Sequence, residues 1–248
     1  MKEIKEIKIL KVFIVFYRVT IFVLAYILYL VQIIFIFLNL KSISRKVFSY
    51  SSYLASLALG IVYRLNKQMT KNLCKDGIHI ANHDSPLDIF IAQYIFQMPT
   101  ITTVKKHLEG FLPFFELSLK NYGHYNFDHL KLNERKSAYL FLNRMCSKKN
   151  NILIFPSGSI YTSINHRFSK SVLNLSIKYD LNVIAWKFFY LDYSKSNIRY
   201  EKNIFSYILK RFVAEDTEIC VENVKVFNYK EYTNLEKFYS ALIRFYLP

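Results

Sequence analysis

A run of 22 uncharged residues, from Val19 to Leu40, limits the possible folds of this chain more than any other stretch. At about 1.5 Å per helical residue it would be about 30 Å long, enough to cross the hydrocarbon core of a bilayer. The run is too long for a cleaved signal peptide, and no small-residue cleavage site follows it. Lysine and arginine flank it on both sides, so charge does not fix an orientation. We therefore expect a membrane-associated segment, either a full span or a hairpin that enters one leaflet.

The next stretch, Val47 to Tyr63, is rich in aromatic residues, leucine and alanine. This composition predicts a second helix that lies in the membrane interface or packs on the rest of the protein. We expect residues 1–66 to form N-terminal membrane-associated helices and residues 67–248 to form one further domain.

Beyond about residue 72, apolar runs of strand length alternate with longer runs of helical character. This alternation predicts an α/β fold in which helices flank a mostly parallel central sheet, and the last strand could be an antiparallel edge. The expected strands are Gly77–Ala81, Thr100–Val104, Tyr122–Phe127, Asn151–Phe155, Asn182–Phe189 and Glu218–Phe227. The expected helices are Pro86–Gln97, Pro113–Leu119, Asn133–Cys146, Phe168–Tyr179, Ile204–Phe212 and Glu231–Tyr246.

The charge balance is strongly basic, with a net charge of +16 and a hydrophobic share of 52%. Such an excess suits an anionic membrane surface, a phosphate-bearing substrate or nucleic acid, although A/T-rich coding would also enrich lysine. The lysines are dispersed and no nucleic-acid motif is present, so we expect no nucleic-acid partner. Three widely spaced cysteines, Cys74, Cys146 and Cys220, form neither a disulfide framework nor a metal-ligand pattern. We expect free thiols in a reducing compartment, and neither a metal nor a cofactor.

Histidine and aspartate stand close together where the first of these strands gives way to a helix. His83 lies in the turn, and Ser85-Pro86 predicts the helix start, which places Asp88 in the first helical turn. The Asp88 carboxylate can then reach one ring nitrogen of His83, leaving the other nitrogen free to accept a proton. The alternative is structural: Ser85 and Asp88 also match a capping box, in which Asp88 would bind backbone N–H groups.

The string Asn82-His83-Asp84-Ser85-Pro86-Leu87-Asp88 resembles the His-x4-Asp motif of the glycerolipid acyltransferases, the family that includes 1-acylglycerol-3-phosphate acyltransferase. Three later blocks resemble family motifs in the expected order, and a strand near Leu181–Trp186 resembles a fourth. The three blocks are Lys105-Lys106-His107-Leu108 with Pro113-Phe114-Phe115, Gly123–His129, and Phe155-Pro156-Ser157-Gly158-Ser159. The resemblance implies that His83 and Asp88 are catalytic.

The resemblance also implies substrate-binding residues, although the sequence departs from the family at several of them. His129 stands in place of an arginine, Ser157 in place of a glutamate, and Ile160 in place of a second arginine. In the resembled family these residues bind the acceptor, and a histidine does not supply the two parallel N–H donors with which an arginine binds a phosphate. Lys105, Lys106, Arg167, Lys170 or a protonated His129 could substitute. We therefore predict substrate contacts from Lys105, Lys106, Gly123, Asp128, His129, Ser157, Gly158, Ser159 and Lys170.

The implied function is a membrane-bound enzyme that moves an acyl chain to the sn-2 hydroxyl of 1-acylglycerol-3-phosphate and gives phosphatidic acid. The donor would be acyl-CoA or an acyl carrier protein, and the catalytic domain would lie on the cytoplasmic side of the cytoplasmic membrane. The altered motifs leave two alternatives. One is an acyltransferase for another lysophospholipid or lipid alcohol, and the other is a catalytically silent, basic membrane-binding homologue.

Overall fold

The computed structural model describes residues 2–65, 76–83, 85, 87–97, 100–103, 125–127, 131–155, 170–191 and 204–246. Its centre is a seven-stranded sheet with the order β1-β7-β6-β2-β5-β3-β4. The strands are β1 Ile61–Leu65, β2 Gly77–Ala81, β3 Thr100–Thr103, β4 Tyr125–Phe127, β5 Ile152–Ile154, β6 Asn182–Tyr190 and β7 Thr217–Phe227. The predicted α/β fold with a mostly parallel sheet is confirmed, since β6 and β7 form the one antiparallel pair in that described order.

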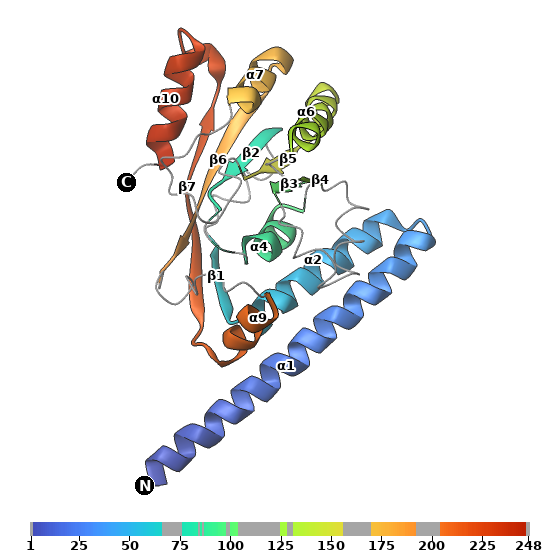
Figure 1. The fold of residues 1–248 in the computed structure, drawn as a ribbon, viewed down its shortest axis with the longest axis vertical. Coiled ribbons are helices and arrows are strands. Elements are labelled where there is room, and N and C mark those ends of the chain that lie inside the picture. The colour runs from blue at the N-terminus through green and yellow to red at the C-terminus, as the bar shows by residue number, and fades with distance from the viewer. Residues whose placement is uncertain are drawn as a thin grey trace.

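Helices cover both faces of this sheet (Figure 1). The helices are α1 Lys2–Phe37, α2 Lys41–Ala58, α4 Asp88–Ile95, α6 Leu132–Ser147, α7 Lys170–Tyr179, α9 Ile204–Val213 and α10 Leu235–Tyr246, with a short 3₁₀ helix, η2, at Tyr229–Glu231. One apolar core joins α1, α2, α4 and α9 to one sheet face, and a second joins α6, α7 and α10 to the other. The sheet therefore separates a layer next to the N-terminal helices from a layer that faces away from them.

Most predicted strands and helices between residues 77 and 246 agree with the described elements to within about two residues, but the last helix, expected from Glu231, begins only at Leu235. β2 matches its predicted range, while β6 and α6 differ by a residue or so at their ends. The predicted helix at 113–119 lies outside the described residues. The expectation of a helical start at Pro86 is not met in the described part, because regular helix begins at Asp88.

The second N-terminal helix was predicted wrongly at its end. It was expected to run from Val47 to Tyr63, but α2 begins six residues earlier, at Lys41, and ends at Ala58, and Ile61–Leu65 forms the parallel edge strand β1 beside β7. Gly60 makes the break: its φ of 72° lies in the left-handed region, which glycine adopts without steric cost. The β-branched and aromatic residues that follow favour a strand once a neighbouring strand is available.

The last strand was predicted to be a possible antiparallel edge strand. It is antiparallel to one neighbour, but it is not at the edge. β7 is antiparallel to β6, with a register irregularity between Ala185 and Lys187, but it is parallel to β1 on its other side. β7 is therefore an internal strand, because the unpredicted β1 covers its outer edge.

The side chains of β6 alternate between the two cores. Val183 and Ala185 join the core under α6, α7 and α10, whereas Ile184, Trp186, Phe188 and Tyr190 join the core that contains α4. This is the period of two expected for a strand buried on both faces. Tyr190, at the end of the strand, therefore faces the same side of the sheet as α4.

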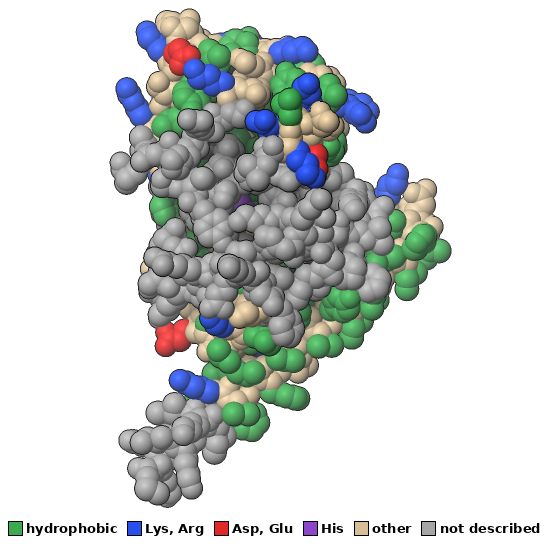
Figure 2. All heavy atoms as spheres, viewed as in Figure 1, with side chains coloured by type: hydrophobic (Ala, Val, Ile, Leu, Met, Phe, Trp, Pro, Cys, Tyr) green, Lys and Arg blue, Asp and Glu red, His purple; other side chains and the backbone are tan. Residues whose placement is uncertain are grey.

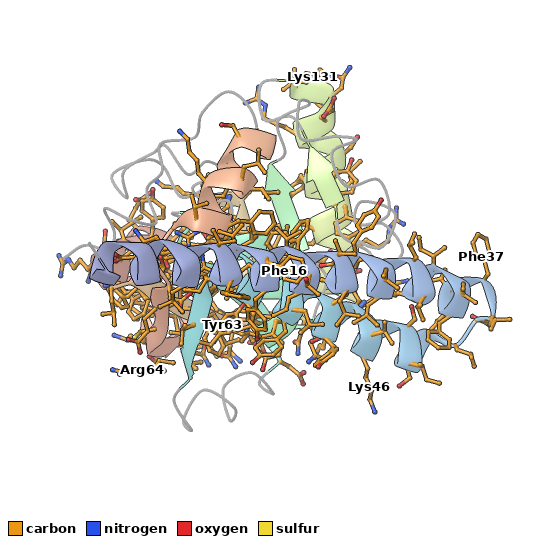
Figure 3. The ribbon with its side chains drawn as sticks, turned by 90° about the horizontal axis from the view of Figure 1, so that it is seen from below. Phe16, Phe37, Lys46, Tyr63, Arg64 and Lys131 are labelled. Carbon is orange, nitrogen blue, oxygen red and sulfur yellow. The ribbon has the colours of Figure 1, made fainter. Side chains whose placement is uncertain are left out.

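The N-terminal helices form an antiparallel pair that lies along one side of the sheet domain (Figures 1 and 3). α1 is the one described helix that is long and apolar enough, over Leu10–Phe37, to cross a membrane by length and composition. Much of its surface is exposed and apolar, as at Phe16 and Phe37, which are 71% and 82% exposed. Figure 2 shows this apolar surface along α1, with lysine and arginine side chains gathered at the opposite end of the molecule, near α6, α7 and α10.

Candidate active site

The exit of β2 is fixed by a pair of hydrogen bonds between Asn82 and β6. The Asn82 side-chain amide donates to the Phe188 carbonyl over 2.9 Å and accepts from the Phe188 N–H over 2.7 Å. Asn82 thus continues the ladder between β2 and β6 by one step with its side chain. As a result, His83 emerges at the carboxyl edge of the parallel strands, where α/β folds place their sites.

The turn after His83 is closed by side-chain hydrogen bonds that also start α4. The Ser85 hydroxyl accepts from the Leu87 N–H over 3.2 Å, and the Asp88 carboxylate accepts from the Ser85 N–H over 3.0 Å. The Asp88 half of this pattern is that of a capping box, but the Ser85 hydroxyl binds the N–H two residues on rather than three, and the helix N-cap is Leu87. The structural interpretation of Asp88 is therefore correct as far as it goes.

Asp88 also bonds to His83. The Asp88 Oδ2 atom lies 2.8 Å from the His83 Nδ1 atom. The carboxylate is fully buried, whereas the imidazole is 16% exposed and packs on the Phe155 ring at 4.8 Å between centroids. With Nδ1–H donated to the carboxylate, the Nε2 atom is left to accept a proton. One carboxylate thus organises the turn and orients the imidazole.

A third partner of Asp88 comes from β6, where the Tyr190 hydroxyl donates a hydrogen bond to the other carboxylate oxygen, Oδ1. Burial, followed by the nearby Asp88 charge, raises the pKa of the Tyr190 phenol well above its ordinary value. The phenol is therefore protonated, and a hydrogen-bond donor, throughout the neutral range.

An acyltransferase family model matches residues 64–188, which is half of the chain and contains both His83 and Asp88. The chain belongs to this acyltransferase family. A solved structure, the 1-acyl-sn-glycerophosphate (LPA) acyltransferase PlsC from Thermotoga maritima, matches with a TM-score of 0.61 and 12% identity, over 96% of this chain and 97% of that one. At 12% identity, this structural similarity shows a shared fold and nothing more specific. A comparison with curated proteins gave no match.

Most of the substrate-binding residues predicted for this acyltransferase lie outside the described residues. These are Lys105, Lys106, Gly123, Asp128, His129, Ser157, Gly158 and Ser159. The described one is Lys170, at the start of α7. Its ammonium group lies 2.5 Å from the Glu236 carboxylate and over the Tyr239 ring of α10. The roles of all nine residues stay predictions.

Two residues that hydrogen-bond in or beside the His83–Asp88 pair were not singled out from the sequence: Asn82, which was noted only as part of the motif, and Tyr190. The alternation along β6 could have indicated Tyr190, because a side chain two residues after Phe188 and four after Trp186 lies on the same face of a strand. His79, four residues before His83, is buried and accepts from the Trp186 indole over 3.1 Å. No group of three or more possible metal ligands occurs among the residues that the structure describes.

Proposed function

We propose that this acyltransferase transfers an acyl chain from an acyl thioester to the sn-2 hydroxyl of 1-acylglycerol-3-phosphate, giving phosphatidic acid. The observation that carries the proposal is the 2.8 Å contact between His83 Nδ1 and Asp88 Oδ2 at the carboxyl edge of the sheet. It leaves the Nε2 atom of a partly exposed imidazole as a base for a hydroxyl. No serine or cysteine nucleophile is needed, because a thioester is already activated.

In the proposed step the acceptor oxygen bonds to the thioester carbonyl carbon while its proton moves to His83 Nε2. Collapse of the tetrahedral intermediate breaks the carbon–sulfur bond, and the leaving thiolate takes the proton from His83. Asp88 stabilises the imidazolium that exists between these two transfers. A positioned base of this kind contributes about 10²–10⁴-fold, and the alignment of two bound substrates contributes much of the rest.

The proposed location is the cytoplasmic membrane, with the sheet domain on the cytoplasmic side. The exposed apolar length of α1 supports membrane attachment, and the basic end of the molecule lies away from α1 (Figure 2). Cys146 and Cys220 are free thiols in the described part, which suits a reducing compartment. Acyl-CoA or an acyl carrier protein would then be available as donor on that side.

The test is to incubate the purified full chain with labelled lysophosphatidate and either acyl-CoA or acyl carrier protein thioester. We expect phosphatidic acid from the wild type and a loss of about 10²–10⁴-fold in His83→Ala. Asp180→Asn is a control for carboxylate changes in general, because Asp180 is exposed and pairs with Lys230 on the surface. Turnover that survives His83→Ala at the wild-type rate would falsify the role of His83.

Another lysophospholipid or a lipid alcohol is the second candidate acceptor, because the family's acceptor-binding arginines and glutamate are replaced by His129, Ile160 and Ser157. Competition among lyso-lipids for the labelled acyl chain separates the two candidates. Lys170→Ala and Glu236→Ala form a matched pair for the phosphate contact. If Lys170 binds the acceptor phosphate, the first change alone raises the acceptor KM; if the ion pair is structural, the two act alike.

A catalytically silent membrane-binding homologue is the remaining alternative, motivated by the same replacements and by the basic charge of +16. It predicts binding to anionic vesicles that is unchanged by His83→Ala, with no transfer to any acceptor. Detectable transfer to one acceptor rejects it.

A further inference from the structure

We propose that Tyr190 is a positioning residue for the acyl transfer, holding the Asp88 carboxylate in the one orientation that presents Oδ2 to His83. The inference rests on the proposed function, because it assigns Tyr190 to the same dyad. It adds a residue from β6 that lies outside the His-x4-Asp motif and 102 positions away from Asp88.

The two oxygens of Asp88 have different partners. Oδ2 lies 2.8 Å from His83 Nδ1 and 3.0 Å from the Ser85 nitrogen, whereas Oδ1 accepts from the Tyr190 hydroxyl. Rotation of the carboxylate about its Cβ–Cγ bond would weaken the contacts on both oxygens at once. The Tyr190 hydrogen bond therefore fixes the angle at which Oδ2 meets the imidazole.

Burial makes this hydrogen bond hard to replace with water. Asp88 is 0% exposed and Tyr190 is 7% exposed, in the core shared by α4 and β6. Hydrogen bonds to a buried charged group are among the stronger ones in proteins, because both partners have given up their hydration. Loss of the Tyr190 hydroxyl would thus leave the carboxylate free to adjust its orientation around the remaining donors.

One strand holds both ends of the segment that carries His83. At its start, the Phe188 backbone holds the Asn82 amide by two hydrogen bonds, and at its end the Tyr190 side chain holds Asp88. Phe188 and Tyr190 are two apart on β6 and share a sheet face. β6 lies between β2 and β7 inside the sheet, so both anchors belong to a rigid element. His83 is therefore held from two sides by one internal strand.

The experiment compares Tyr190→Phe with Tyr246→Phe in the full-length protein. Tyr246 is a matched control, since it is 1% exposed and donates its hydroxyl over 3.0 Å to the Ile80 carbonyl, in the core on the opposite face of the sheet. Both changes remove one buried hydroxyl and keep the ring. We expect kcat to fall about 10- to 100-fold in Tyr190→Phe, with both KM values within about twofold, and to stay within about threefold in Tyr246→Phe.

A double variant tests whether Tyr190 acts through Asp88. In an Asp88→Asn background, Tyr190→Phe should reduce kcat by less than about threefold further, because the carboxylate it positions is gone. An equal loss in both backgrounds would show an effect independent of the dyad and would overturn the proposal.

Proton NMR gives a readout that needs no substrate, so failure of the proposed function and failure of this inference can be told apart. The His83 Nδ1–H, bonded to a carboxylate, should give a downfield resonance that is identified by its absence in His83→Ala. We expect this resonance to shift or broaden in Tyr190→Phe and to stay in place in Tyr246→Phe. If Tyr190→Phe does not fold, fluorotyrosine in place of Tyr190 keeps the ring and strengthens the donor, and should move the same resonance. A resonance insensitive to position 190 contradicts the positioning role.

Discussion

Arg18 of α1 and Asp216, just before β7, form an ion pair of 2.6 Å across 198 positions of the chain. The other nitrogen of the guanidinium, Nη1, donates to the carbonyls of Arg211, Phe212 and Ala214, at the C-terminal end of α9. A cation at this end of a helix satisfies carbonyls that have no partner within the helix and offsets the helix dipole. One arginine of the apolar helix therefore caps a helix of the sheet domain.

Replacing Arg18 should loosen α1 from the sheet domain. Arg18→Ala leaves the end of α9 uncapped, and we expect the free energy of unfolding to fall by about 1–3 kcal/mol, since Asp216 is largely exposed and water can replace part of the contact. Arg18→Lys should recover little of this stability, because a single ammonium group cannot reach both Asp216 and the carbonyls of α9 as a planar guanidinium does. Thermal unfolding in detergent measures this. Thr20→Ala is the control, since the Thr20 hydroxyl bonds only one turn back within α1, to the Phe16 carbonyl. Equal stability of Arg18→Ala and Thr20→Ala would contradict the capping role.

Two glycines with positive φ should differ sharply in their tolerance of alanine. At Gly77, with φ of 155°, an added Cβ would lie 2.4 Å from the Asn182 backbone carbonyl of β6. At Gly60, with φ of 72°, it would meet the Arg18 Nη2 atom at 2.9 Å, the end of a side chain that can shift more readily than backbone, at some cost to its ion pair with Asp216. Both variants carry backbone strain of about 1–2 kcal/mol, and Gly77→Ala adds a clash that only a shift of β2 against β6 can relieve. We expect Gly77→Ala to have the lower unfolding temperature; the reverse order would show that β2 and β6 separate easily.

Asp88→Asn should damage the turn and the chemistry together. The asparagine amide has one acceptor oxygen, whereas the Asp88 carboxylate accepts from His83, Ser85 and Tyr190 through two. We expect kcat to fall at least as far as in Tyr190→Phe, and the free energy of unfolding to fall by about 1–3 kcal/mol. Urea unfolding and steady-state kinetics on the same preparation measure both. An Asp88→Asn enzyme with normal stability would indicate that the hydrogen bond between the Asp88 carboxylate and the Ser85 N–H is dispensable.

Stability should fall steeply in alkaline solution. Burial raises the pKa of Tyr190 and Tyr246 well above their ordinary value of 10, so the folded state keeps protons that the unfolded state releases above that pH. The free energy contributed by this difference is present below pH 10 and is lost as pH rises toward the folded-state pKa, by at most about 1.4 kcal/mol per pH unit for each tyrosine. Urea unfolding from pH 9 to pH 11 should show the decline, with a shallower slope in Tyr246→Phe. An unchanged slope would mean that Tyr246 ionises without unfolding.

The sequence predicted the strands and helices around His83 well because their patterns are local. Alternation and apolar runs located β2, β6 and β7, and the turn residues Ser85 and Asp88 predicted both the cap and the dyad. β1 was missed because Ile61–Leu65 becomes a strand only beside β7, some 150 residues later, while the residues before it are helical. The place of Tyr190 depends on the same kind of long-range pairing, here between β6 and the start of α4. The local sequence pattern around a residue does not show which distant strand or helix it will pack against.

The pairing of β1 with β7 has a consequence for synthesis on the ribosome. β1 is the first described strand to emerge, yet its neighbour at Thr217–Phe227 is the last one. α1 is therefore synthesised long before the sheet can close, and a product that stops ahead of Thr217 would leave β6 and β1 with open edges. Such edges recruit other chains, so premature termination late in this gene should yield aggregates rather than a smaller working enzyme.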